Sequence, residues 1–256
     1  MGSNGFTPTS LADALEILAT ERAIPVAGGT DLMVRHRRGG PLPIQLDAPP
    51  MFIGRLPELR AVTETASDLT IGAAVTLNDV AAHPSAPPGL TAAIAEFASP
   101  AVRNAGTIGG NICNASPAGD TLPYLYAAGA TVVLATASTE RALPIMEFIT
   151  GPGQTLLGED ELMTKVIIPR QPAPFVFYRK VAPRRSNALS KLSVYAEAGM
   201  DGNSASHGAP PYVTRFRLAV GAAARTVIRI PDAETLIEGA TTTEIRDRAD
   251  ELLEAY

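Results

Sequence analysis

The 256-residue sequence contains a single cysteine, Cys113, and no tryptophan. One thiol excludes an intrachain disulfide, and it excludes an iron–sulfur cluster or zinc site held by cysteines of this chain alone. The three histidines, His36, His83 and His207, stand too far apart for the spacing of metal ligands. We therefore predict no metal centre in this chain and interpret each histidine as a surface or locally bonded side chain.

Long apolar runs and runs of one charge are also missing. No segment reaches the ~18 apolar residues that a membrane-spanning helix needs, and the N-terminus has no basic, apolar leader. The net charge is −5, and the most basic stretch, RHRRGG at 35–40, is short enough to be interpreted as a solvated loop. These absences argue against a nucleic-acid partner and against a membrane span, and they predict a cytoplasmic protein.

The apolar material that is present, 46% of the residues, is enough for a sizeable core. Ser10 and Asp13 resemble the start of a capped helix over 10–20, and Thr76 is expected to cap a second helix. Tyr124 and Tyr126 cannot share one helix face, so one is expected in the core and the other at a subunit contact. Hydrophobic periodicity predicts strands at 23–27, 43–48, 131–135 and 163–169, a hairpin within 60–75, and helices at 77–83, 90–98 and 121–130.

The pattern changes after the proline-rich segment at 169–174. Three segments, at 175–182, 190–199 and 212–223, alternate polar and apolar residues, as strands of an antiparallel sheet do. Two helices are expected to close the chain, near 232–239 and 242–255. We therefore predict an α+β protein with a domain boundary at this proline cluster.

Two glycine-rich segments form the candidate site. VAGGTDL at 26–32 directly follows a predicted strand, and TIGGN at 107–111 lies within the core-poor stretch at 103–120. Adjacent glycines let a backbone approach a ligand closely, and successive N–H groups then form a concavity suited to phosphate oxygens. One such loop is usually an ordinary turn, whereas two in one chain favour a ligand with two phosphates. We interpret the pair as a pyrophosphate site between two subdomains.

Neither segment has the spacing of a common nucleotide motif. The sequence contains no G-x-G-x-x-G fingerprint in this context and no Walker sequence, which disfavours a kinase or a nucleoside triphosphatase. No Gly-x-Ser-x-Gly motif and no cluster of histidine with acids is present either, so no catalytic side chain is predicted.

Three motifs in this order, VAGGTDL, RNAGTIGGNICNASPAGDTLP and YRKVAPRRSNALSK, resemble the FAD-binding medium subunit of the molybdenum hydroxylases, the xanthine dehydrogenase and carbon monoxide dehydrogenase family. The resemblance covers nearly the whole chain. It implies a two-lobed FAD-binding domain of the PCMH type (vanillyl-alcohol oxidase-like) over 1–170, with lobes at about 1–54 and 55–170. A smaller domain of an antiparallel sheet and helices would follow over 174–256.

The resemblance also implies the residues that contact FAD. The first segment would hold the pyrophosphate, the second would form the opposing arm, and single residues elsewhere would complete the pocket. Phe97 would lie against the isoalloxazine, Ile108 near the flavin, Asp120 at the adenosine end, and Lys180 would reach the cofactor from the sheet. The full set is Val26, Ala27, Gly28, Gly29, Thr30, Asp31, Leu32, Phe97, Thr107, Ile108, Gly109, Gly110, Asn111, Ser116, Asp120, Leu162 and Lys180.

Several of these residues have an ordinary structural interpretation as well. Phe97 and Leu162 are equally compatible with a plain hydrophobic core. Asp120 precedes a predicted helix and could cap it. Lys180 lies in a basic segment that is normally solvated, and Cys113 is expected to be a small buried residue, reactive only if it is exposed near a flavin.

The function implied by the resemblance is electron transfer. Substrate would be oxidised at a molybdenum–pterin centre on a large partner subunit, and [2Fe–2S] clusters on a small subunit would pass electrons to FAD in this chain. A final acceptor such as NAD, oxygen or a quinone would then take them, since the flavin carries the redox chemistry. The implied assembly is a dimer of heterotrimers, and the family usually has a further C-terminal tail that this sequence does not contain.

Two alternatives remain open at the level of sequence. One is a stand-alone FAD-dependent oxidoreductase of the same fold, which would turn over substrate by itself. The other is a non-catalytic phosphate-binding or scaffolding module, which would bind no flavin.

Overall fold

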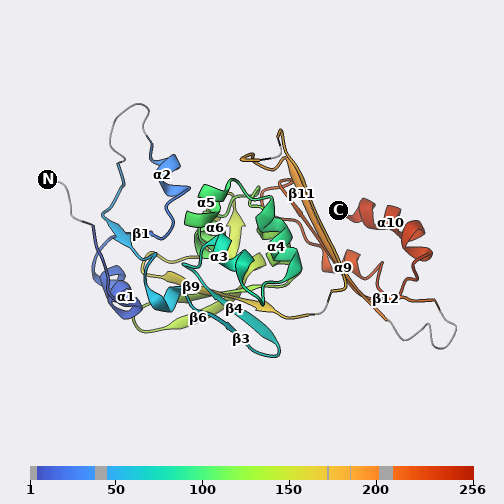
Figure 1. Cartoon of the computed structure of the whole chain (residues 1–256), viewed down its shortest axis with the longest axis horizontal. Coiled ribbons are helices and arrows are strands. Elements are labelled where there is room, and N and C mark those ends of the chain that lie inside the picture. Colours follow the sequence, from blue (N-terminus) through green and yellow to red (C-terminus); the bar gives the residue numbers. More distant parts are fainter. Residues whose placement is uncertain (1–4, 38–44, 172, 185, 202–209) are drawn as a thin grey trace.

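The computed structural model describes residues 5–37, 45–171, 173–184, 186–201 and 210–256. Figure 1 shows an elongated molecule with the N-terminal elements at one end, a central sheet and its helices in the middle, and a second sheet with the C-terminal helices at the other end. Among the described residues, no helix combines the length and the apolar character that crossing a membrane requires.

The N-terminal end is built on a short parallel pair of strands. Helix α1 (Leu11–Thr20) begins where predicted, because the Ser10 hydroxyl accepts the Asp13 N–H at 3.1 Å. Strand β1 (Ile24–Val26) pairs with β2 (Pro50–Phe52), and a four-residue helix, α2 (Leu32–Arg35), follows the first glycine segment.

The strand predicted at 43–48 is wrong in its described part. Residues 45–48 form no strand, and residues 43 and 44 lie outside the described residues. Pairing with β1 begins only at Pro49, whose carbonyl accepts the Ile24 N–H at 2.9 Å. Pro50 then occupies the first position of β2, where the N–H that proline lacks is not needed.

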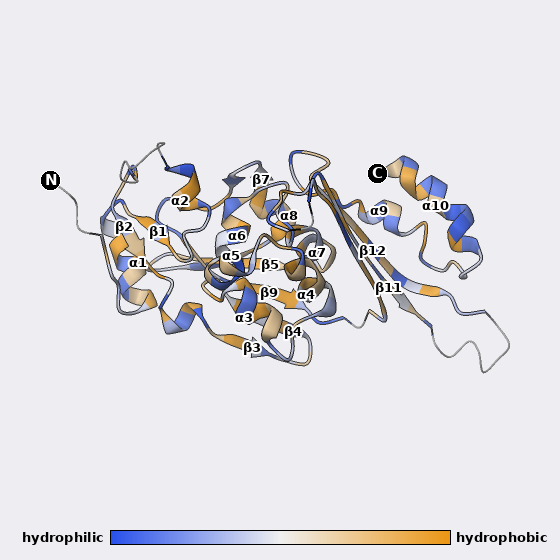
Figure 2. Ribbon diagram, turned by 45° about the horizontal axis from the view of Figure 1, so that its top comes forward, coloured by the Kyte–Doolittle hydropathy of each residue, from blue (hydrophilic) through white to orange (hydrophobic). Residues whose placement is uncertain are grey.

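The central sheet is antiparallel throughout, in the order β3-β4-β9-β5-β6. It confirms the predicted hairpin and the strands expected at 131–135 and 163–169. Figure 2 shows hydrophobic residues concentrated along β5 and β9, in the middle of this sheet. The strands are β3 (Val62–Glu64), β4 (Asp68–Gly72), β5 (Thr131–Ala135), β6 (Glu140–Pro144) and β9 (Leu162–Pro169).

Short helices cover the sheet and bury the main hydrophobic core against it. The predicted cap at Thr76 is confirmed, since its hydroxyl accepts the Asp79 N–H at 3.1 Å. These elements are η1 (Pro57–Leu59), α3 (Leu77–Ala82), α4 (Pro88–Ala95), α5 (Pro100–Ala105), α6 (Ile108–Asn114), α7 (Leu122–Ala127) and α8 (Ile145–Phe148), with a small β7–β8 ribbon (Ile149–Gly151 and Gln154–Thr155).

The C-terminal sheet has the predicted antiparallel order of β10 (Phe175–Val181), β11 (Leu192–Met200) and β12 (Val213–Gly221). Helices α9 (Pro231–Glu234) and α10 (Glu244–Ala255) cover one face of it around Leu252. The other face packs on the N-terminal half, and Tyr195 of β11 belongs to the main core. That core therefore crosses the proline cluster at which the sequence changes character.

Helix α7 lies in this junction, between α4 and α8 on one side and β11 and β12 on the other. Tyr124 and Tyr126 are consequently both buried, at 4% and 2% exposure. The expectation that one of them faces a subunit contact is wrong, because the C-terminal sheet covers the face that a bare helix would expose.

Candidate FAD-binding pocket

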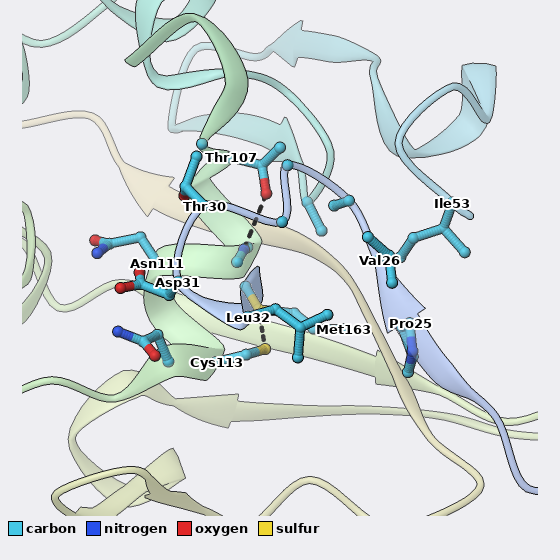
Figure 3. Close-up of a pocket in the computed structure, with 18 of the residues that line it drawn as sticks. Pro25, Val26, Thr30, Asp31, Leu32, Ile53, Thr107, Asn111, Cys113 and Met163 are labelled. Atoms are coloured by element: carbon cyan, nitrogen blue, oxygen red, sulfur yellow. Dashed lines mark hydrogen bonds between the residues drawn. The ribbon is translucent and has the colours of Figure 1, made fainter. Parts of the chain in front are cut away.

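Both glycine-rich segments line a single pocket of about 280 Å³. Figure 3 shows the first segment passing over the start of α6, with β9 beneath them. Leu162 and Met163 of β9 form part of the lining, together with Ile53 and Leu77. The sequence places these segments some eighty residues apart, and the fold brings them together, as predicted for a ligand held between two arms.

The first segment offers a row of unused backbone donors. The Val26 carbonyl still belongs to the ladder, accepting the Ile53 N–H at 3.0 Å, and Gly29 then turns the chain with a φ of 69°. Within the described part of the chain, we find no protein acceptor for the backbone N–H groups of residues 28–32. Such a row, leading into a helix and facing a pocket, suits phosphate oxygens.

Gly28 marks the place where the two arms touch. A Cβ on Gly28 would overlap the carbonyl oxygen of Ala105 and lie 2.7 Å from its carbonyl carbon and 2.9 Å from the Cα of Gly106. A side chain there cannot be accommodated without moving one backbone away from the other. The glycine is therefore required by the close approach of the two segments.

The second segment is not the loop that the sequence suggested. TIGGN forms the first turn of α6, with Thr107 as N-cap and its hydroxyl accepting the Gly110 N–H at 3.1 Å. The N–H groups of Ile108 and Gly109 are bonded to the carbonyls of Val75 and Ala73, each at 3.0 Å. These two donors are already used within the protein, so the predicted backbone nest at this arm is wrong.

Side chains, rather than that nest, present polar groups from α6 to the pocket. Asn111 lines the pocket and is 7% exposed, and its Oδ1 accepts the Thr121 hydroxyl at 2.5 Å. That bond orients the amide and leaves Nδ2 as the group that can donate to a ligand. On the facing arm, the Thr30 hydroxyl is the corresponding side-chain donor.

Most residues that the sequence singled out line this pocket. Ile108, Ser116, Asp120 and Lys180 are not among the lining residues, and Ile108 is fully buried in the main core. Their contact with a cofactor stays a prediction. The predicted residues that do line the pocket are Val26, Ala27, Gly28, Gly29, Thr30, Asp31, Leu32, Phe97, Thr107, Gly109, Gly110, Asn111 and Leu162.

Asp120 and Lys180 form a buried ion pair. Lys180 Nζ lies 2.8 Å from Asp120 Oδ2, and the Ser190 hydroxyl donates to Oδ1 at 2.7 Å. Burial raises the pKa of the Asp120 carboxyl, while Lys180 and Ser190 act in the opposite direction. The alternative interpretations are thus wrong: Lys180 is only 5% exposed, and α7 has Thr121 as its N-cap, with no side-chain cap bond.

Two further contacts at the pocket were missed by the sequence analysis. Arg35 is exposed, as expected for a solvated stretch, but it ends helix α2 and donates to the Asn114 carbonyl at 3.3 Å and also to its side-chain oxygen. Residues 38–40 of that stretch lie outside the described residues. Cys113 lines the pocket, donates to Met163 Sδ at 3.7 Å, and burial raises its pKa to about 12.

A helical interpretation of the second segment would have placed Cys113 and Asn114, though not Arg35, at the pocket. On a helix starting at 108, positions 110, 113 and 114 fall on one face, because they are spaced by three and four. The signal was a threonine at the N-cap position followed by Ile108 and Ile112, a pair on a single buried face. The two adjacent glycines concealed it.

Residues 3–171 match the family described as FAD binding domain in molybdopterin dehydrogenase. The chain belongs to this family. It is therefore an FAD-binding subunit of the medium-chain type, in a family of oxidoreductases. The pocket fits FAD: one arm supplies unpartnered N–H groups for a diphosphate, and apolar side chains from β9, Ile53 and Leu77 supply a surface for a ring.

Individual relatives agree with this family. The chain is 32% identical over 240 residues to the xanthine dehydrogenase FAD-binding subunit of Escherichia coli O157:H7, covering 90% of this chain and 77% of that one. It is 34% identical over 199 residues to the nicotinate dehydrogenase FAD-subunit of Eubacterium barkeri, covering 73% and 65%.

A solved structure extends the likeness to the fold. A chain of the carbon monoxide dehydrogenase from Hydrogenophaga pseudoflava, in a form lacking the Mo-pyranopterin moiety, superimposes with a TM-score of 0.82 at 28% identity. The match covers 96% of this chain and 84% of that one. It includes the C-terminal sheet and helices, which the family match over 3–171 leaves out.

Proposed function

We propose that this FAD-binding subunit is the electron-transfer subunit of a molybdenum-containing hydroxylase or dehydrogenase. It would receive electrons from [2Fe–2S] clusters of a small partner subunit and deliver them to a final acceptor, while a large molybdopterin-binding subunit oxidises the substrate. Bound FAD would supply the redox chemistry, and the chain would bind and orient it. We further propose a cytoplasmic dimer of heterotrimers.

The convergence of both glycine segments on one pocket is the observation that carries this proposal. A diphosphate bears charge along its whole length, so it needs donors over several ångströms. The unpartnered N–H groups of residues 28–32 supply them from one side, and Asn111 Nδ2 and the Thr107 end of α6 face them.

The proposed roles of the remaining lining residues follow from their chemistry. Phe97 would lie against the isoalloxazine, and Leu162 would bound the pocket and exclude water from the ring system. Arg35, through its bonds to Asn114, would hold α2 against α6 and keep the arm closed over the cofactor. No side chain of this chain is proposed to transfer a proton.

The finer fold assignment belongs to the same proposal. We place the FAD-binding domain in the two-lobed PCMH type, with the boundaries given above, and treat 174–256 as the C-terminal domain of the subunit. A hydrophobic cluster distinct from the main core gathers around α1 and β2 and supports a first lobe, although it also includes Leu56, Leu59, Ala74, Ala135 and Leu162 from beyond residue 54.

Titration of the purified chain with FAD tests the binding step. We expect about one FAD per chain, a visible flavin spectrum, and competition by ADP, which shares the diphosphate. Absence of FAD binding at micromolar concentrations would contradict the proposal and favour the phosphate-binding module.

Electron transfer is tested with reconstituted complex. The isolated FAD-loaded chain should show no substrate turnover, and turnover should appear only when the large and small subunits are added. Turnover by the isolated chain alone would instead establish the stand-alone oxidoreductase.

A further inference from the structure

The turn that carries Phe97 into the pocket is held by all three of its carbonyl oxygens. It follows α4, and Ala98 has a left-handed φ of 40°. The Glu96 oxygen accepts from Lys180 Nζ at 2.9 Å, and the Phe97 oxygen accepts from Arg103 Nη1 at 2.7 Å. The Ala98 oxygen accepts a backbone N–H of the loop between β10 and β11 at 2.9 Å. Two of the three donors thus come from the C-terminal sheet region.

Of the three donors, Lys180 carries the largest desolvation penalty, because its ammonium is buried. Its side chain is 5% exposed, and an ammonium removed from water needs a charged partner and hydrogen bonds. Asp120, at 7% exposure, is that partner, and Ser190 holds its second oxygen. Buried ion pairs contribute little net stability compared with apolar side chains of similar volume, so fold stability alone gives little reason for one at this position.

We propose that Lys180 is a positioning residue for the flavin ring. By holding the Glu96 carbonyl it fixes the Phe97 side chain at the pocket, and the ion pair with Asp120 keeps the ammonium directed at that carbonyl. The inference rests on the proposed function, because it takes FAD to occupy the pocket that Phe97 lines. It differs from a direct contact between Lys180 and FAD, since here Lys180 acts through Phe97.

A double-mutant cycle on FAD affinity separates the two roles. The variants K180M, F97A and K180M/F97A are titrated with FAD, using the full chain. Loss of one aromatic contact is expected to weaken FAD binding about tenfold, and K180M should produce a loss of the same order. Residues that act as one unit are not additive, so K180M should change the dissociation constant less than about twofold once Phe97 is absent.

A matched control removes a comparable bridge elsewhere in the same junction. Arg229 is 11% exposed, pairs with Glu234 at 2.9 Å, and donates to the Tyr126 carbonyl at 3.0 Å. R229M therefore removes a buried, cross-junction cation that does not touch the Phe97 turn. It should leave the FAD dissociation constant within about twofold of wild type. K180R, which keeps the charge and the donors, should restore most of the affinity.

Each outcome decides the matter. The inference is overturned if the effects of K180M and F97A on the free energy of FAD binding are fully additive in the double variant. It is also overturned if R229M weakens FAD binding as much as K180M does, or if F97A leaves the affinity unchanged. D120N takes the place of K180M in the same cycle if K180M does not fold. Failure of the wild-type chain to bind FAD would defeat the proposed function itself, whereas wild-type binding with fully additive variants would defeat only the positioning role.

Discussion

Replacing Gly28 with alanine should damage the cofactor pocket far more than the same change one residue later. The added Cβ at position 28 would overlap the Ala105 carbonyl oxygen and sit 2.7 Å from its carbon, whereas carbon–carbon contacts normally begin near ~3.5 Å. The first arm must therefore move by roughly an ångström away from the second arm. That shift displaces the N–H groups of residues 28–32 that face the pocket.

The magnitude follows from the donors that are displaced. Each hydrogen bond to a charged group is worth about 1.5–3 kcal/mol, so losing good geometry at two of them costs ~3–6 kcal/mol. FAD binding should weaken by at least about 100-fold in Gly28→Ala. At Gly29, a Cβ would have ordinary contacts, 3.6 Å from Met33 Cγ, and only the φ of 69° opposes it. Gly29→Ala should cost about 1–2 kcal/mol of unfolding free energy and change FAD affinity by less than about tenfold.

The assay is a titration of both apo variants with FAD, followed by flavin fluorescence, beside urea unfolding of each apo protein. The unfolding curves show whether a loss of affinity reflects a displaced arm or a loss of folded protein. The reasoning is refuted if Gly28→Ala binds FAD within threefold of wild type, or if Gly29→Ala loses as much affinity as Gly28→Ala.

Three further predictions concern stability and reactivity. Glu234→Ala leaves buried Arg229 without its carboxylate and should lower the free energy of unfolding by about 3–5 kcal/mol, while Glu64→Ala, in an exposed pair, should leave the urea midpoint close to wild type; equal urea midpoints for the two variants would contradict this. Gly109→Ala should lower the apo protein's Tm by several degrees at about 2–4 °C per kcal/mol, because its Cβ would press α6 off the end of β4; an unchanged Tm would refute it. The Cys113 pKa is raised to about 12 by burial, so this thiol stabilises the fold fully below pH ~9 and loses that contribution as pH rises towards 12. Because Cys113 is partly buried and lines the pocket, it should react with thiol reagents at pH 8 much more slowly in the folded chain than after unfolding, and equal labelling rates in the two states would contradict the raised pKa.

Local features explain which elements were predictable. The caps at Ser10 and Thr76 and the alternation of β10 to β12 depend on neighbours in sequence, and all of them are confirmed. The loop predicted for the second glycine segment is wrong because its conformation depends on residues that are distant in the sequence. Its helix depends on Ala73 and Val75, which lie just after β4, more than thirty residues earlier, and whose carbonyls accept its first N–H groups.

The residues of the candidate site also fall into two groups, those predictable from neighbouring sequence and those placed by distant contacts. The first glycine segment follows a strand, turns at Gly29 and lines the pocket, because a strand followed by two glycines and a polar residue is a local pattern with a local consequence; its contact with a diphosphate stays a prediction. The roles of Asp120 and Lys180 could not be derived from sequence. Nothing near Lys180 in the chain indicates that it is buried, and its partner lies sixty residues away.

By itself, the amino-acid sequence of this protein determined its class, the order of most of its helices and strands, and the choice of the two glycine-rich segments as the candidate site. These depend on composition, periodicity and glycine chemistry, which act over a few residues. Only the tertiary structure decided that the two segments share one pocket, that one of them is a helix, and that the C-terminal sheet holds the turn bearing Phe97. Those outcomes depend on which distant backbone groups satisfy one another when the core closes, and no local pattern encodes that choice.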